Sequence, residues 1–132
     1  LARADIVSLH CPLSDKTRGL IGEKELQLMK TGALIINTAR GKLIDEPALI
    51  AALKSGRLAG AGLDTFATEP PDPANPLFAL PNVILTPHIS SSTTGAAAQM
   101  GTIGAQNIIS YLRGEIYDPA NFLNPEVFDR KN

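Results

Sequence analysis

Short apolar runs alternate with amphipathic stretches along this chain of 132 residues. Four of the runs have the length and the aliphatic, β-branched composition of strands. The stretches between them repeat their apolar residues at helical spacing. Alternation of this kind is typical of parallel strands joined by helices, so it predicts an α/β fold. The predicted strands span residues 6–9, 33–38, 59–66 and 83–86.

Two segments have special patterns. Ala33 to Thr38 is apolar at nearly every position, which predicts a strand buried on both faces. The segment from Glu69 to Pro81 breaks the alternation and contains five prolines. Because proline removes a backbone donor, we expect a loop without regular structure there.

The first helix is expected between the first two strands. Glu23 places an acid in its first turn, and Lys30 places a base in its last. Leu26 and Met29 are expected to point inward. This helix is therefore predicted over residues 23–30.

Two further helices carry signals at both ends. Asp45 is suited to cap the second helix, which Gly56 ends. The serine and threonine cluster at residues 90–94 offers caps to a third helix, which runs to Arg113 and ends at Gly114. The apolar residues expected on their faces are Leu49, Ile50 and Leu53 in the second helix and Met100, Ile103, Ile108, Tyr111 and Leu112 in the third.

Composition narrows the class of protein. Lysine and arginine number 12 against 13 aspartate and glutamate, a net charge of -1, which excludes a strongly basic nucleic-acid binder. Charged residues or glycine interrupt every apolar run short of the ~20 residues that a membrane helix needs, so we expect no membrane segment. The single cysteine, Cys11, forms no internal disulfide, which favours a reducing compartment and a cytoplasmic location.

Polar and titratable residues gather where the predicted strands end. Ligands of open parallel sheets bind outside the carboxyl ends of the strands. Both histidines of the chain lie at such ends, together with an arginine and two acids. This set contains candidates for an acid, a base, an anion clamp and an orienting carboxylate. Its members are His10, Arg40, Asp64, Glu69 and His88.

Each of these residues also has a purely structural interpretation. Arg40 after a buried strand is typical of a surface arginine paired with an acid, and Asp64 suits a turn. Either histidine could bond to backbone, and Glu69 could be an ordinary loop residue. Cys11 is more often a small buried hydrophobe than a nucleophile. Taken singly, none of these residues establishes a function.

Other chemistries match the sequence less well. Serines at residues 90–92 stand near His88, but no Gly-x-Ser-x-Gly turn is present for a hydrolase. The two histidines and one cysteine lack the paired spacing of zinc ligands, so we expect no metal site. Neither the Gly-x-Gly-x-x-Gly nor the Gly-x-x-x-x-Gly-Lys phosphate loop occurs.

The order of the segments resembles one enzyme family. Residues 29–45, MKTGALIINTARGKLID, resemble the signature of the D-isomer-specific 2-hydroxyacid dehydrogenases, which include glyoxylate or hydroxypyruvate reductases and phosphoglycerate dehydrogenases. Residues 7–13, 62–70 and 86–89 resemble further family segments, in the family's order. The resemblance covers about residues 1–114. It implies half of a doubly wound, Rossmann-like parallel sheet of about four strands with flanking helices.

The resemblance assigns catalytic roles to three residues. It implies that Arg40 binds the carboxylate and carbonyl oxygen of a 2-oxo acid, a contact that its planar fork suits. His88 would be the general acid in reduction and the general base in oxidation. Glu69 would orient the imidazole and favour its protonated form. The implied reaction is hydride transfer between a nicotinamide cofactor, NAD or NADP, and a small 2-oxo or D-2-hydroxy acid.

Further residues are implied on the cofactor side of the site. Asp64 would accept a hydrogen bond from the nicotinamide carboxamide. The other residues would line the nicotinamide and its ribose. The complete implied set is His10, Cys11, Pro12, Thr38, Ala39, Arg40, Asp64, His88 and Ser90.

Parts of the family pattern do not occur in these residues. The resemblance places the glycine turn for pyrophosphate, the residue that selects NAD or NADP and the substrate domain before Leu1. We therefore expect a fragment of a dehydrogenase with little turnover on its own. Residues 1–114 would form the C-terminal half of the dinucleotide-binding domain, and residues 115–132 would form a C-terminal tail.

Two other functions stay open at this point. The chain could be a module that senses a dinucleotide or binds a partner on the same scaffold, or it could be a self-associating half-domain. The strand at residues 6–9 would lie at an open edge of the sheet and carries no charge to oppose pairing. We therefore expect either a homodimer through this edge or a rearranged strand or terminal segment that covers it.

Overall fold

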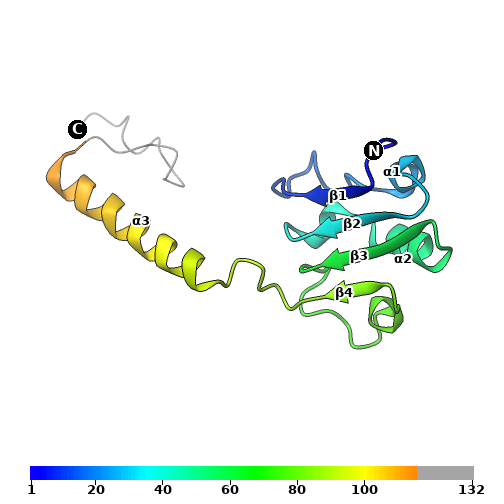
Figure 1. Cartoon of the computed structure of the whole chain (residues 1–132). Coiled ribbons are helices and arrows are strands. Elements are labelled where there is room, and N and C mark those ends of the chain that lie inside the picture. The colour runs from blue at the N-terminus through cyan, green and yellow to red at the C-terminus, as the bar shows by residue number, and fades with distance from the viewer. Residues whose placement is uncertain (116–132) are drawn as a thin grey trace. The chain divides into compact units, whose positions relative to one another are not determined.

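The computed structural model describes residues 1–115 and divides into two units, residues 1–90 and the residues from Ser91 onward. The first unit contains a parallel sheet with the strand order β1-β2-β3-β4 (Figure 1). Because all four strands run in the same direction, the loops that follow them lie along one edge of the sheet. The α/β fold predicted from the sequence is confirmed. The strands are β1 (Ile6–Leu9), β2 (Ala33–Asn37), β3 (Leu58–Leu63) and β4 (Val83–Leu85).

The core of this unit lies between one face of the sheet and two helices. The helices are α1 (Glu23–Leu28) and α2 (Glu46–Lys54). Leu26 and Met29 are buried as predicted, and so are Leu49 and Leu53, whereas Ile50 is half-buried. These side chains form one apolar cluster with the buried residues of β2 and β3.

The opposite face of the sheet is open within residues 1–90. Along β2 the side chains of Ala33 and Ile35 are buried, whereas Leu34 between them is exposed and Ile36 is half-buried. The prediction that residues 33–38 are buried on both faces is therefore wrong for the described residues. The reason is that α1 and α2 join the same core cluster and so cover one face only.

α1 ends two residues earlier than the predicted end at Lys30. Met29 adopts extended backbone angles and directs its side chain into the core. The guanidinium of Arg57 donates hydrogen bonds to the carbonyl oxygens of Gln27 and Met29. These bonds occupy carbonyl groups that the last helical turn leaves without a helical partner, so the helix can end there.

α2 has the predicted signals at both ends. The carboxylate of Asp45 accepts a hydrogen bond from the amide of Ala48 at 3.1 Å, which caps the first turn. Gly56 follows the helix with a φ of +73°, a left-handed conformation that glycine adopts without steric cost. The chain then enters β3.

β3 and the segment after it differ from the prediction in two ways. β3 ends at Leu63 rather than Phe66, because its neighbour β4 ends opposite Leu63 and leaves the later residues without a strand to pair with. The proline-rich segment also contains regular structure, a 3₁₀ helix over Pro76–Ala79. The side chain of Asn75 accepts a hydrogen bond from the amide of Leu77 at 2.9 Å, and a proline fits the first turn because no helical donor is needed there.

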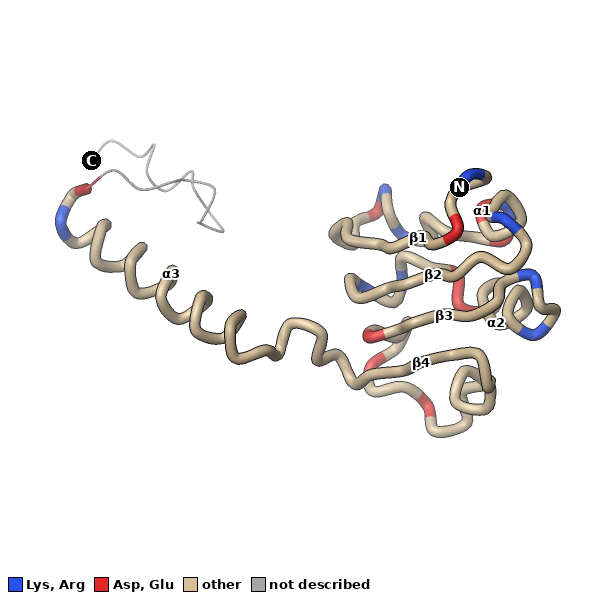
Figure 2. The backbone as a smooth tube through the Cα atoms, viewed as in Figure 1, with Lys and Arg blue, Asp and Glu red and all other residues tan. Residues whose placement is uncertain are grey.

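The second unit contains α3 (Thr94–Arg113). Thr93 caps it by accepting a hydrogen bond from the amide of Ala96 at 3.1 Å, and Gly114 ends it with a φ of +65°. Figure 2 shows that α3 carries no charged residue before Arg113, and the five apolar residues predicted for its face are all exposed. No helix among residues 1–115 is long and apolar enough to cross a membrane. Apart from its first residue, the predicted tail at residues 115–132 lies outside the described residues.

Candidate active site

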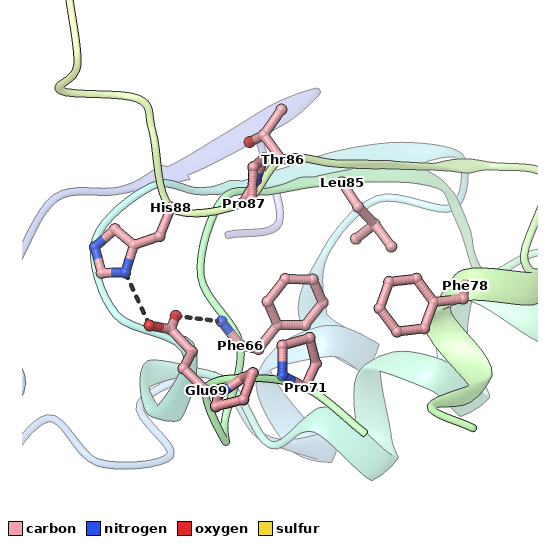
Figure 3. A pocket seen from close by; sticks show the side chains of 9 residues that line it. Phe66, Glu69, Pro71, Phe78, Leu85, Thr86, Pro87 and His88 are labelled. Atoms are coloured by element: carbon pink, nitrogen blue, oxygen red, sulfur yellow. Dashed lines mark hydrogen bonds and ion pairs between the residues drawn. The ribbon is translucent and has the colours of Figure 1, made fainter. Parts of the chain in front are cut away.

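His88 and Glu69 form an ion pair at the carboxyl edge of the sheet. The Nδ1 atom of His88 lies 2.9 Å from Oε2 of Glu69, and Oε1 of Glu69 accepts a hydrogen bond from the amide of Phe66 at 3.0 Å (Figure 3). The hydrogen bond with His88, followed by the one from Phe66, lowers the pKa of Glu69 below its ordinary value, although partial burial opposes the shift. Glu69 is therefore poised to hold the imidazole ring as a carboxylate.

Arg40 faces the same cavity as this pair. The cavity has a volume of about 230 Å³, and its lining includes Arg40, Glu69 and His88. The structure thus brings together the three residues predicted to be catalytic from the loops that follow β2, β3 and β4. A cation, an imidazole and a carboxylate around one cavity can bind a small anion and transfer a proton to it.

The turn that carries Arg40 is fixed by two neighbours. The side chain of Asn37 donates to the carbonyl oxygen of Arg40 at 2.9 Å and accepts from the amide of Ala39 at 3.1 Å. Gly41 follows at a point where an added Cβ atom would lie 2.0 Å from the backbone carbon of Phe66. Only glycine permits this close approach, which holds the Arg40 turn against the loop that leads to Glu69.

Asp64 lies beneath the His88 loop. Its side chain is 2% exposed and accepts hydrogen bonds from the hydroxyl of Thr86 at 2.6 Å and from the amides of Ile89 and Ser90, both at 2.9 Å. Burial alone raises the pKa of a carboxyl group, but the combined hydrogen bonds outweigh it and hold the pKa of Asp64 well below its usual range. The carboxylate is thus engaged by residues on both sides of His88.

A second cavity lies on the side predicted to hold the cofactor. It has a volume of about 590 Å³ and shares Arg40 and Leu13 with the cavity of the His88 and Glu69 pair. The ring of His10 also contacts its own strand, because Nε2 lies 2.8 Å from the hydroxyl oxygen of Ser8. Five of the residues predicted to bind the cofactor line this cavity: His10, Cys11, Pro12, Ala39 and Arg40. The other predicted residues, Thr38, Asp64, His88 and Ser90, do not line it.

A third cavity, of about 400 Å³, lies on the other side of the ion pair. Figure 3 shows Phe66, from the loop after β3, and Phe78, from the 3₁₀ helix, facing it, with Glu69 and His88 at one end. The two phenyl rings are 5.9 Å apart between centroids. This cavity is almost entirely apolar, so the His88 and Glu69 pair separates an apolar space from the cavity that Arg40 lines.

Sequence reasoning missed two residues that shape the site. Asn37 was included only as part of a strand, and Gly41 only as part of a family signature. The signal for Asn37 was its polar side chain directly after an apolar run, since asparagine often bonds to backbone two residues further on. The role of Gly41 depends on the position of Phe66, 25 residues away in the sequence, which a pattern along the chain does not reveal.

Comparison with known proteins gives the family. Residues 1–90 match the model of the D-isomer specific 2-hydroxyacid dehydrogenase, NAD binding domain. The chain belongs to this family. Its Rossmann-like parallel sheet, with an arginine, a glutamate and a histidine at the carboxyl edge, lies within the residues that match this NAD binding domain.

Individual relatives agree with the family. The chain is 50% identical over 127 residues to a glyoxylate reductase of Thermococcus litoralis, covering 96% of this chain and 38% of that protein. It is 53% identical over 114 residues to a D-3-phosphoglycerate dehydrogenase of Methanocaldococcus jannaschii, covering 86% of this chain and 22% of that protein. The chain thus spans less than two fifths of the length of these relatives.

A solved structure agrees with the fold as well. The D-isomer specific 2-hydroxyacid dehydrogenase of Lactobacillus delbrueckii ssp. bulgaricus, in its NAD complexed form, is 41% identical and superposes with a TM-score of 0.81. The match covers 89% of this chain and 40% of that chain.

Proposed function

We propose that this chain forms the catalytic half of the nucleotide-binding domain of an NAD- or NADP-dependent D-2-hydroxyacid dehydrogenase. The observation that carries the proposal is the pairing of His88 with Glu69 at 2.9 Å beside Arg40 in one cavity. A module that only senses a dinucleotide needs no acid-base pair next to an anion-binding arginine. The enzyme therefore explains the site better than the sensor does.

Arg40 is the proposed anchor of the substrate. Its guanidinium can donate two parallel hydrogen bonds to the carboxylate of a small 2-oxo acid. The cavity of about 230 Å³ suits an acid of a few carbon atoms, as the glyoxylate reductase and D-3-phosphoglycerate dehydrogenase relatives also suggest. Arg40 also lowers the cost of the negative charge that develops on the carbonyl oxygen.

His88 is the proposed acid and base. Because Nδ1 is engaged by Glu69, Nε2 is the atom that delivers a proton to the substrate oxygen in reduction and removes it in oxidation. The Glu69 carboxylate stabilises the protonated ring and restrains its rotation, much as an orienting acid does in a catalytic triad. The lowered pKa of Glu69 keeps the carboxylate ionised for this role.

The cofactor is proposed to lie against the turns after β1 and β2. The cavity of about 590 Å³ there is lined by the His10 to Pro12 turn and by Ala39, and it opens beside Arg40, which fits a flat ring placed next to the substrate. Thr38, Asp64 and Ser90 belong to the proposed cofactor set as well, although they do not line this cavity. The nicotinamide, when bound, supplies or accepts the hydride. The choice between NAD and NADP rests on residues outside this set.

Three finer features belong to the same proposal. Because the chain spans 38% of the matched reductase, we expect residues 1–132 alone to turn over slowly, since proximity and exclusion of water need the rest of the enzyme. Among residues 1–115, β1 is an edge strand of the sheet, which supports a homodimer of the 132-residue chain through that edge. The free thiol of Cys11 supports a cytoplasmic location.

A chimaera tests the function. In this chimaera, residues of the present chain replace the 127 matched residues of the Thermococcus litoralis glyoxylate reductase. We expect it to oxidise NADH or NADPH with glyoxylate, hydroxypyruvate or pyruvate, at roughly 1 to 1,000 turnovers per second. The control is Arg40→Lys, which keeps the charge but loses the planar fork and should raise KM for the 2-oxo acid. A folded chimaera without turnover on any of these acids would contradict the proposal.

A further inference from the structure

Two buried polar side chains stand at the carboxyl ends of neighbouring strands. Asn37 ends β2 and is 1% exposed, and Asp64 follows β3 and is 2% exposed. The amide of Asp64 donates a hydrogen bond to the carbonyl oxygen of Asn37 at 3.0 Å, so the two residues are also joined through their backbones. Burying polar groups is unfavourable unless each finds partners. The partners therefore indicate what these residues are for.

Among residues 1–115, both side-chain hydrogen bonds of Asn37 go to the turn that carries Arg40. Its oxygen accepts from the amide of Ala39, and its nitrogen donates to the carbonyl oxygen of Arg40. The side-chain amide of Asn37 thus bonds to the backbone of both Ala39 and Arg40 and holds the turn in place. A shorter or apolar side chain would leave the Ala39 amide and the Arg40 carbonyl without these bonds and free the turn to move.

The bonds of Asp64 bracket His88 in the same way. Thr86 donates from two residues before the histidine, and Ile89 and Ser90 donate from the two residues after it. His88 itself has a φ of +55°, a left-handed conformation that residues other than glycine seldom adopt. Such a conformation persists only when surrounding contacts impose it. The carboxylate of Asp64 supplies these contacts and thereby directs the ring toward Glu69.

We propose that Asn37 and Asp64 are positioning residues that act separately, Asn37 on substrate binding through Arg40 and Asp64 on proton transfer through His88. The inference rests on the proposed function, because it takes Arg40 as the carboxylate anchor and His88 as the acid. A purely structural role in the core predicts something different. Loss of either side chain would then lower stability and affect binding and turnover alike.

Kinetics of the chimaera separate these two roles. Asn37→Leu keeps the size of the side chain and should raise KM for glyoxylate about tenfold or more while kcat falls less than about threefold. Asp64→Asn should lower kcat about tenfold to a hundredfold with KM for glyoxylate within about threefold. The matched control is Thr65→Val, because Thr65 is equally buried beside Asp64 and its hydroxyl has no hydrogen-bond partner among residues 1–115.

Thr86→Val provides a second variant on the His88 loop. It removes the bond of 2.6 Å to Asp64 from a residue at the rim of the site, so the core stays filled even if Asp64→Asn fails to fold. We expect Thr86→Val to lower kcat as Asp64→Asn does, but by a smaller factor. If Asp64 acted only by binding the nicotinamide carboxamide, Asp64→Asn would raise KM for the cofactor, and Thr86→Val would leave all constants unchanged.

Nuclear magnetic resonance of the 132-residue chain tests the positioning without turnover. The chain has two histidines, so a His10→Gln variant assigns both ring spectra. The Nδ1 resonance of His88 should change in Asp64→Asn and Thr86→Val but not in Asn37→Leu or Thr65→Val. A His88 resonance that is unchanged in both Asp64→Asn and Thr86→Val would overturn the inference about Asp64. This result is independent of whether the proposed reaction occurs, since an inactive chimaera would contradict only the proposed function.

Discussion

His88 and Glu69 are 19 residues apart in the sequence, and their side chains lie 2.9 Å apart at the edge of the sheet. The two residues come from different loops, one after β3 and one after β4. Their contact therefore depends on the register of these strands, which aligns Leu63 with Leu85. We propose that the pair supplies the acid-base chemistry of the site.

Removing the charge of Glu69 should weaken the acid. In the chimaera, Glu69→Gln keeps the shape of the side chain but no longer stabilises the protonated imidazole, so kcat for reduction should fall about tenfold to a hundredfold. The control is Glu23→Gln on the exposed side of α1. A Glu69→Gln chimaera that keeps the kcat of the parent would contradict the role of Glu69.

Adding a methyl group at Gly41 should disturb the site and the fold together. The new Cβ atom would lie 2.0 Å from the backbone of Phe66, so either the Arg40 turn or the loop to Glu69 must move. We expect Gly41→Ala to lower the free energy of unfolding by about 1–3 kcal/mol, as overpacking does.

Gly101→Ala is the matched control for this substitution. Gly101 lies within α3 with no atom within 4 Å of an added Cβ, so alanine should raise stability by about 0.5–1 kcal/mol. Urea unfolding of both variants gives the comparison. Equal effects at the two positions would show that the close approach of Gly41 to Phe66 does not limit the fold.

Acid should remove the stabilisation that Asp64 provides. The hydrogen bonds lower the pKa of Asp64 in the folded chain below the ordinary value of 3.8, so this stabilisation is complete above that value and declines as the pH falls toward the lower pKa. The difference in unfolding free energy between the parent chain and Asp64→Asn should therefore shrink below about pH 4, by up to about 1.4 kcal/mol per pH unit.

The difference in unfolding free energy is measured by urea unfolding at each pH, and Thr65→Val, measured at the same pH values, is the control. Neither threonine nor valine titrates in acid, so the difference between this variant and the parent should not depend on pH. The account of Asp64 is wrong if the difference for Asp64→Asn is also constant between about pH 6 and about pH 3.

Association through the edge of the sheet should respond to charge on β1. Ile6 lies on this edge strand and is 60% exposed, so Ile6→Lys should oppose strand pairing and shift a dimer toward monomer in light scattering. Leu28→Lys is the matched control, because Leu28 is 59% exposed and lies on α1 rather than on a strand. A parent chain that is monomeric at micromolar to millimolar concentration would contradict the proposed dimer.

Local signals in the sequence predicted the elements well where neighbouring residues determine them. The cap at Asp45 and the left-handed Gly56 delimit α2 because both act within one turn of the helix. β1 was predicted with its observed bounds, since His10 and Pro12 end its apolar run. In the proline-rich segment the same reasoning failed, because Pro76 begins a short helix that the side chain of Asn75 caps.

The candidate site was predicted only in part. Its titratable residues could be found because parallel strands place their ends along one edge, and the family resemblance gave them roles. The contacts of Asn37 and Asp64 with the loops could not be found, because they depend on which backbone groups remain free after the turns have formed. The left-handed conformation of His88 is of the same kind, since histidine has no local preference that requires it.

The turnover of His88→Ala in the chimaera tests the central claim most directly. With glyoxylate and reduced cofactor at saturation, kcat should fall by about a hundredfold to ten thousandfold, because the proposed proton donor is lost, while KM should stay within about threefold. Thr65→Val, measured in parallel, should retain the kcat of the parent. A His88→Ala chimaera whose kcat stays within about threefold of the parent would contradict the assignment of His88 as the acid and base.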